Sequence, residues 1–180
     1  MPRRLSKDKR ELCYPFIFET GPSTDFEVQT DELCSSVGYA LSLLEQELAE
    51  QPALLAELKP ELRQVQALVY HLNGSVRGRM AVEEADLDWL KARYDHHNGF
   101  GAVTGFVLPT GSPAVMALHL CRSGAKKSIR QLVRCEEAGL TVDDRLLRLA
   151  NLLTNYFFCL TVRLKQHLKL EEIPFVSKSY

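Results

Sequence analysis

The stretch from Phe106 to Arg134, FVLPTGSPAVMALHLCRSGAKKSIRQLVR, predicts the central element of the fold. Gly111 gives the backbone freedom that a turn needs, and Ser112 is a good helix N-cap. Pro113 suits the first helical position because it has no N–H group to leave unpaired. The pattern then stays helical until Gly139, a natural helix stop. We therefore expect one long helix over this stretch.

Four basic side chains share one face of this helix. They recur at spacings of three or four residues and are His119, Arg122, Lys126 and Arg130. Such a face is typical of a solvated helix surface. It also fits an anion site, for a phosphate or for an acidic residue of a neighbouring molecule. The spacing alone leaves both interpretations open.

Four other amphipathic segments predict helices, at about 30–51, 53–73, 82–97 and 141–169. We expect Thr30 to cap the first of them and Pro60 to break or kink the second. Without a strand-rich block, the fold class is all-α, a five-helix antiparallel bundle. The expected organisation is an N-terminal extended segment and loop at 1–29, a helical bundle domain at 30–169 and an irregular tail at 170–180.

Composition narrows the function classes. The chain has 180 residues, is 46% hydrophobic and carries a net charge of −1, which fits one domain without a general attraction to nucleic acid or to anionic membranes. No apolar run has the length of a membrane span. The N-terminus is basic but has no apolar core of a secretory signal, and Asp8 and Glu11 argue against an organelle-targeting role. We expect a cytoplasmic protein.

Cysteine and histidine usage argues against a structural zinc site. The five cysteines are scattered and form no CxxC pair, which favours a reducing compartment. His96 and His97 are adjacent but belong to no HExxH pattern. We interpret them as a polar helix end, with metal binding as the alternative.

Three segments resemble the PduO-type ATP:cob(I)alamin adenosyltransferases. TDELCSSVGYA at 30–40, FVLPTGSPAVMALHLCR at 106–122 and NLLTNYFFCL at 151–160 are similar to that family's TVDELN…IG, FILPGG…LHxAR and NRLSDxLFxL segments. The resemblance implies a ferritin-like five-helix bundle that assembles into homotrimers with active sites between subunits. It also implies transfer of the adenosyl group of ATP, in the presence of Mg²⁺, to the cobalt of a reduced cobalamin or other corrinoid.

The resemblance assigns roles to four residues at matching positions. Phe106 corresponds to the aromatic residue that packs beside the corrinoid and excludes its lower ligand. Asp31 and Arg122 correspond to a catalytic carboxylate–guanidinium pair across the subunit boundary. Asn151 corresponds to an asparagine on the nucleotide side.

Other positions depart from the family pattern. The family's ATP loop, TKTGDKGxT, becomes ETGPSTD at 19–25, where Glu19 adds a negative charge. An arginine pair on the central helix becomes Lys126 and Lys127, and a glutamate becomes Ile129. On the last helix an arginine and an aspartate become Leu152 and Asn155. The residues expected to meet ATP are Thr20, Gly21, Lys126, Lys127, Arg130 and Asn151.

Most of these departures fall on the ATP side, so the sequence supports two functional hypotheses. The first is a divergent corrinoid adenosyltransferase. The second is a non-catalytic relative that binds a corrinoid for storage, delivery or sensing. A trimeric helical scaffold without either ligand is a third reading, which the presence of Phe106 argues against.

Overall fold

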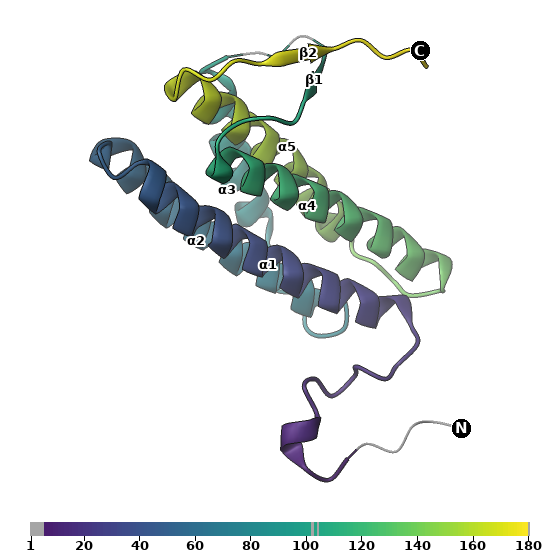
Figure 1. Cartoon of the computed structure of the whole chain (residues 1–180). Helices are drawn as coiled ribbons and strands as arrows, with labels where there is room; N and C mark the ends of the chain where they lie inside the picture. The colour runs from purple at the N-terminus through teal and green to yellow at the C-terminus, as the bar shows by residue number, and fades with distance from the viewer. Residues whose placement is uncertain (1–5, 102, 104, 180) are drawn as a thin grey trace.

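Five α-helices make up most of the chain, which confirms the predicted all-α class. The computed structural model describes residues 6–101, 103 and 105–179. The helices are α1 (Pro22–Glu47), α2 (Pro52–Ser75), α3 (Glu84–Asn98), α4 (Pro113–Glu137) and α5 (Asp144–His167) (Figure 1). A short 3₁₀ turn (Lys9–Glu11) and two short strands, β1 (Phe106–Leu108) and β2 (Ile173–Phe175), complete the described elements.

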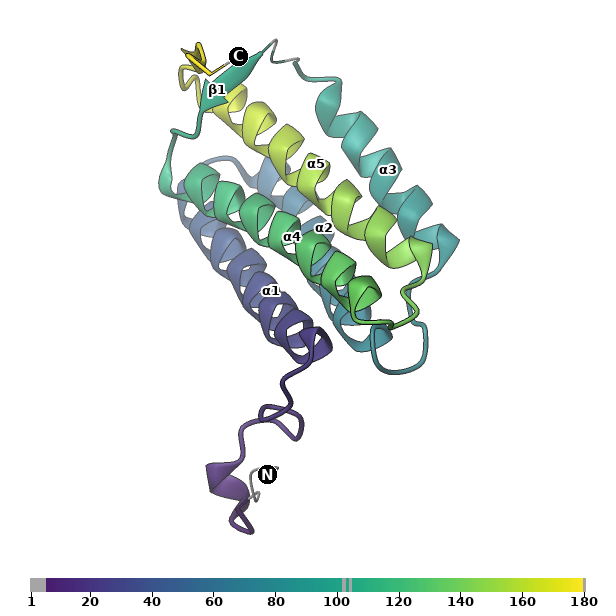
Figure 2. The same ribbon diagram turned by 90° about the vertical axis from the view of Figure 1, so that its right-hand side faces the viewer.

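The helix predicted from the stretch 106–134 is α4, and it lies at the centre of the bundle. α4 packs between α1 and α5, while α2 lies against α1 and α3 lies against α5 (Figure 2). Apolar side chains from the five helices are buried in one core, including Leu44 of α1, Val65 of α2, Leu118 of α4 and Leu153 of α5. Burial of these side chains supplies the main stabilisation of the bundle.

The start of α4 follows the sequence prediction closely. The Ser112 side chain caps the helix by accepting from the Val115 backbone N–H, and Gly111 has φ +147°. A Cβ atom at Gly111 would lie 2.7 Å from Val115 Cγ1, so the turn requires glycine. Glu47, at the end of α1, accepts from Ser112 Oγ at 2.6 Å and from the Ala114 N–H at 2.8 Å. One carboxylate therefore joins the two helix ends.

The expected start of the first helix was wrong. α1 begins at Pro22, so residues 22–29 form helix and not loop. Gly21 is the N-cap, and Pro22 occupies the first turn, where its missing N–H costs nothing. Thr30 does not cap; its buried hydroxyl donates back to the Phe26 carbonyl at 2.8 Å.

Pro60 does not break α2, which runs through it. The residue lies on the exposed side of the helix, while Leu58 and Leu62 on either side are fully buried. Their packing offsets the lost backbone hydrogen bond. The last helix, expected from about residue 141, begins at Asp144, and Asp143 caps it by accepting from the Arg145 N–H.

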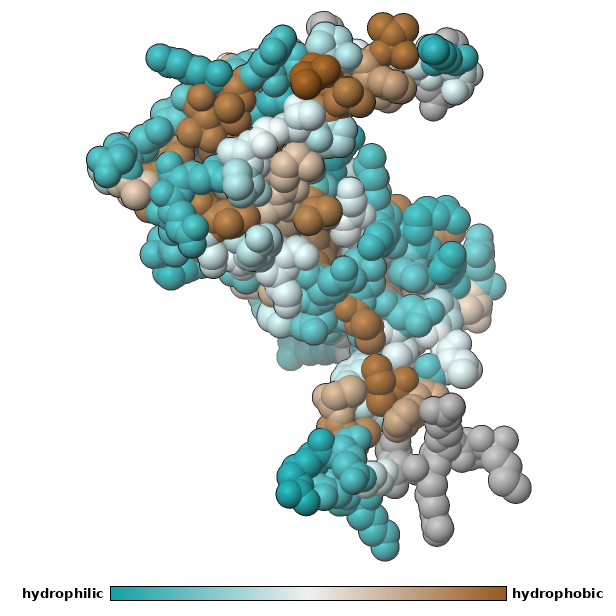
Figure 3. Space-filling model, viewed as in Figure 1, coloured by the Kyte–Doolittle hydropathy of each residue, from teal (hydrophilic) through white to brown (hydrophobic). Residues whose placement is uncertain are grey.

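The tail is not irregular throughout, because β2 pairs antiparallel with β1. The buried ammonium of Lys165, near the end of α5, donates to Glu172 Oε2 at 2.7 Å and so holds the chain just before β2. Apolar side chains gather at this end of the molecule, over the two strands (Figure 3). In the described part of the chain, no helix is both long and apolar enough to cross a membrane.

Candidate functional site

Arg122 lies at the contact between α4 and α5. Its guanidinium carbon is 4.6 Å from the centroid of the Phe158 ring, a cation–π distance. The side chain is half-buried, and this burial lowers the pKa of Arg122 from its usual value. Within the described chain Arg122 has no acidic partner. A partly desolvated cation of this kind favours an anion or a carboxylate supplied from outside the chain.

Two hollows follow the side of α5 that carries Phe158. One, of about 200 Å³, is lined by Phe158, Asn155, Tyr94 and residues of the loop before β1. The other, of about 350 Å³, is lined by Asn155, Asn151 and Arg148. Asn155 belongs to both, so the hollows adjoin. Arg122 lies over Phe158, which lines the first hollow, while Asn151 lines the second and donates from its Nδ2 to the Leu147 carbonyl at 2.8 Å.

Three cations continue the α4 surface beyond Arg122. Lys126, Lys127 and Arg130 are exposed, and none of them forms an ion pair among the described residues. His119 does not belong with them, contrary to the expected four-residue face. It is buried, and desolvation, followed by the nearby charge of Arg122, lowers the pKa of His119.

Phe106 lies on β1, opposite Phe175 of β2, and is 64% exposed. Leu108 lies opposite Ile173 in the same register. Because alternate residues of a strand share a face, these four apolar side chains lie on one side of the two-stranded ribbon. An exposed apolar face at the C-terminal end of α5 is suited to a large, flat, apolar ligand.

Asp31 lies elsewhere, on the exposed side of α1. Its Oδ1 accepts from the Tyr70 hydroxyl of α2 at 3.0 Å, and this contact raises the pKa of Tyr70 to about 12. Within a single described chain Asp31 and Arg122 do not form an ion pair. A pairing of the two therefore requires a second copy of the chain.

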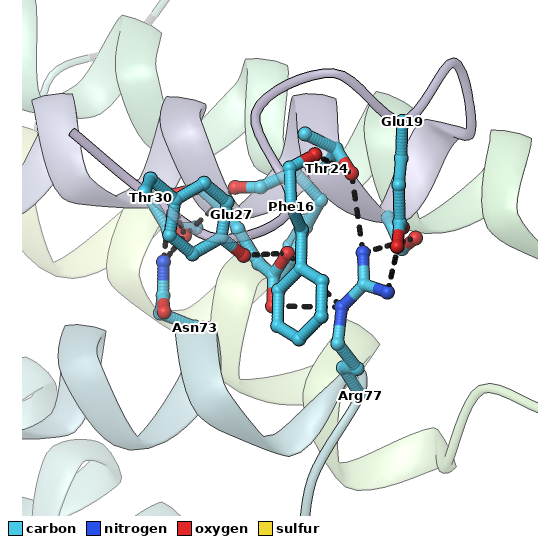
Figure 4. Close-up of polar contacts among 10 residues, drawn as sticks. Phe16, Glu19, Thr24, Glu27, Thr30, Asn73 and Arg77 are labelled. Carbon is cyan, nitrogen blue, oxygen red and sulfur yellow. Dashed lines mark hydrogen bonds and ion pairs between the residues drawn. The ribbon is translucent and has the colours of Figure 1, made fainter. Parts of the chain in front are cut away.

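Thr20 and Gly21 form the turn before α1, and their neighbours are held by Arg77, a residue that the sequence analysis did not single out. Arg77 follows α2 and bonds to Glu19, Ser23, Thr24 and Glu27 (Figure 4). The negative charge of Glu19 is therefore paired, at 2.8 Å. No local pattern around Arg77 indicates this role, because its partners lie 50 to 58 residues away.

A cavity of about 430 Å³ lies beside this cluster, between the N-terminal segment and the α1–α2 pair. Its walls include Tyr14 and Ile17 from the segment, Val28 and Asp31 from α1, and Asn73 from α2. The N-terminal segment thus forms one wall of a hollow that reaches Asp31.

His97 is not part of a polar helix end, because it is fully buried. Its Nε2 lies 2.5 Å from Glu61 Oε1, and Arg163 Nη1 lies 2.8 Å from its Nδ1. His96 is exposed and contacts Glu57 at 2.8 Å. Among the described residues, Glu57, His96 and His97 form the one group whose ligand atoms are close enough for a metal. Arg163 donates to both Glu57 oxygens, at 2.6 and 2.7 Å. The positive charge of its guanidinium therefore already neutralises the carboxylate that a metal ion would need.

The α4 surface does not fit magnesium. Mg²⁺ prefers carboxylate oxygens, and the position that resembles the family's glutamate holds Ile129. The described acidic residues of α4, Glu136 and Glu137, lie at its far end. The function proposed below therefore depends on no magnesium ligand from this helix.

Comparison with known proteins identifies the family. The model of the cobalamin adenosyltransferase family matches residues 22–164, which contain all five helices except the last three residues of α5. The chain belongs to this family. Corrinoid adenosyltransferase MMAB from Bos taurus is 28% identical over 146 residues, which cover 73% of this chain and 56% of the bovine protein. A corrinoid adenosyltransferase from Bacillus subtilis is 28% identical over 134 residues, covering 71% of this chain and 66% of the bacterial protein. The chain thus spans little more than half the length of the mammalian relatives.

Solved structures share the fold of this family member. A phenylalanine-to-alanine variant of the PduO-type ATP:corrinoid adenosyltransferase from Lactobacillus reuteri, complexed with cobalamin and ATP, has a TM-score of 0.75 at 22% identity. The match covers 89% of each chain. An arginine-to-lysine variant of that enzyme, complexed with ATP, has a TM-score of 0.73 at 23% identity and covers 88% of this chain and 90% of that one.

Proposed function

We propose that this protein transfers the adenosyl group of ATP to the cobalt of a reduced corrinoid. The main support for the proposal is Arg122, a half-buried cation that lies over Phe158, within the family match, and has no acidic partner among the described residues. The names of the relatives supply the reaction class, and the hollows along α5 supply a place for two ligands.

The chain's own residues have positioning and electrostatic tasks in this reaction. Cobalt(I) attacks the ribose 5′ carbon of ATP, the carbon–oxygen bond to the phosphate breaks, and triphosphate leaves with the electron pair. Lys126, Lys127 and Arg130 stabilise the negative charge of that leaving group. Asn151 holds the nucleotide. Phe106 packs on the corrinoid's lower face and excludes water from the cobalt, while the remaining gain comes from holding the two reactants together.

The proposed assembly is a homotrimer with a site at each subunit boundary. Arg122 of one subunit then pairs with Asp31 of the next, which supplies a carboxylate that Arg122 does not find among the described residues of its own chain. Thr20 and Gly21, at the N-terminal end of the same helix α1, approach the ATP from that second subunit. Five cysteines, all of them free, fit a reducing compartment, and we place the protein in the cytoplasm.

A non-catalytic corrinoid-binding protein is the second candidate. The observation that favours it is the N-terminal turn, where Arg77 is paired with Glu19 and Glu27 and the sequence at 19–25 contains no lysine. In this case the residues that contact the corrinoid are retained, and the adenosyl transfer activity is lost.

Product analysis separates the two candidates. The protein is incubated anaerobically with chemically reduced cobalamin, ATP and Mg²⁺, and adenosylcobalamin and triphosphate are separated by chromatography. Equal amounts of both products support the transferase. Corrinoid that co-elutes with the protein without either product contradicts transfer and supports the binding protein.

A further inference from the structure

Arg77 uses all three nitrogens of its guanidinium on the N-terminal part of the chain. Nε donates to both carboxylate oxygens of Glu27 at 3.2 Å, and Nη1 donates to Glu19 Oε2 at 2.8 Å. Nη2 donates to Ser23 Oγ at 3.0 Å and to Thr24 Oγ1 at 3.1 Å. The guanidinium also lies over the Phe16 ring, 4.3 Å from its centroid (Figure 4). No other described side chain ties as many parts of the N-terminal region together.

These partners lie on both sides of the Thr20–Gly21 turn. Phe16 and Glu19 precede the turn, and Ser23 and Thr24 follow it. The Thr24 N–H donates to the Gly21 carbonyl at 3.2 Å, which closes the first turn of α1. A single side chain, located just after the C-terminal end of α2, therefore contacts residues on both sides of the turn.

Glu27, the buried acidic partner of Arg77, is itself held by hydrogen bonds. Glu27 is 92% buried and also accepts from the Tyr14 hydroxyl, while Asn73 of α2 donates to the Glu27 carbonyl at 2.6 Å and to Thr30 Oγ1 at 2.7 Å. A buried carboxylate is costly without a cation, so Glu27 favours Arg77 in this place. The planar fork of arginine reaches four partners in different directions, which a lysine ammonium on a single stem does not match.

We infer that Arg77 is a positioning residue that holds the Thr20–Gly21 turn in the conformation that receives ATP. This inference rests on the proposed function. Arg77 does not bind the phosphates, because its nitrogens are already used by Glu19, Ser23, Thr24 and Glu27. It acts through the turn, and it does so from a position outside the three segments that resemble the family.

The test combines hydrogen–deuterium exchange with ATP binding by calorimetry on the full chain. Arg77→Met removes the fork, Arg77→Lys keeps the charge, and Arg79→Met is the control, because Arg79 is an exposed neighbour with no ion pair in the described chain. In Arg77→Met we expect backbone amides of residues 16–24 to exchange at least tenfold faster, with α5 unchanged. The dissociation constant for ATP rises at least tenfold, while corrinoid binding stays within twofold. Arg77→Lys falls between the wild type and Arg77→Met.

Glu19→Gln is a second variant that leaves the buried Glu27 contact intact. Glu19 is half exposed, so its substitution does not threaten the fold. If Arg77 positions the turn, loss of this ion pair weakens ATP binding. If Glu19 only repels the triphosphate, the same variant tightens ATP binding, and the inference is overturned.

The remaining outcomes are distinct from one another. Unchanged exchange and unchanged ATP binding in Arg77→Met would overturn the inference while the proposed function stands. A wild-type protein that does not bind ATP, with exchange still faster in Arg77→Met, would overturn the proposed function and the link from the turn to ATP.

Discussion

The guanidinium carbon of Arg122 lies 4.6 Å from the centre of the Phe158 ring, and this contact joins the two helices that carry the candidate site. Phe158 lines one hollow of α5, and Asn155 extends that hollow to Asn151. Within the part of the chain that the structure describes, Arg122 is therefore oriented by an aromatic ring and not by an acidic partner. A cation held in this way can pair with a negative charge from a ligand or from a neighbouring subunit.

Substitution of Arg122 is expected to affect activity much more than stability. In Arg122→Met the long apolar stem remains, but the charge and the stacking on Phe158 are lost. We expect adenosyl transfer, measured as kcat/KM, to fall at least tenfold, or about 1.4 kcal/mol of transition-state stabilisation. The control is Arg63→Met, which removes an exposed arginine of α2 and leaves kcat/KM unchanged. Equal activity of both variants would show that Arg122 has no part in the site.

The proposed trimer gives a direct prediction for the mass in solution. Light scattering at micromolar protein is expected to give three times the chain mass of 20.4 kDa. Asp31→Asn removes the carboxylate offered to the next subunit and shifts the population toward smaller species, while Tyr39→Phe, on an exposed tyrosine of α1, does not. A wild-type monomer would contradict a shared site.

Glu47 is predicted to stabilise the start of α4. Its carboxylate accepts from the Ser112 hydroxyl and the Ala114 N–H, where the helix dipole also favours a negative charge. We expect Glu47→Ala to lower the free energy of unfolding by about 1–2 kcal/mol, measured with urea. Glu50→Ala, an exposed residue just after α1, is the control and stays within about 0.5 kcal/mol.

Glu57 is predicted to make the free energy of unfolding depend on pH in the acidic range. Hydrogen bonding by Arg163 lowers the pKa of Glu57 to about 2, from an ordinary value of 4.5. The unfolded chain thus takes up a proton at higher pH than the folded chain. The stabilisation is complete above about pH 4.5 and is lost as the pH falls toward 2. Because the carboxylate is one-third exposed, we expect a contribution on the order of 1 kcal/mol. Urea unfolding at pH 5.5 and 3 measures it, and Glu57→Gln removes this part of the difference. An unchanged pH dependence in that variant would contradict the assignment.

The parts of the fold that local signals encode were predicted from the sequence. The turn and cap at Gly111 and Ser112 and the apolar spacing of the five helices are local, and the structure confirms them. The start of α1 was placed too late because Thr30 and Asp31 imitate a cap. The signal that starts the helix is Gly21 followed by Pro22, a pair that is equally common in loops.

Contacts between distant parts of the chain were not predictable from local patterns. The buried His97 contacts Glu61 of α2 and Arg163 of α5. The sequence around His97 contains no signal for either contact. The pairing of β2 with β1 and the cluster around Arg77 are equally non-local. Of the expected site residues, Asn151 lines a hollow on α5 and Arg122 lies over Phe158, which lines the adjoining hollow, and the roles of both stay predictions. The roles of Asp31, Thr20 and Gly21 depend on a second chain and stay predictions.

The most direct test of the central claim is the visible absorbance spectrum of cob(II)alamin bound to the protein, recorded anaerobically before and after addition of ATP, Mg²⁺ and a chemical reductant. We predict a shift to a four-coordinate cobalt(II) spectrum when the nucleotide is bound, followed by conversion to adenosylcobalamin after reduction. A bound corrinoid whose spectrum does not respond to ATP, and which is never converted, would contradict adenosyl transfer by this protein.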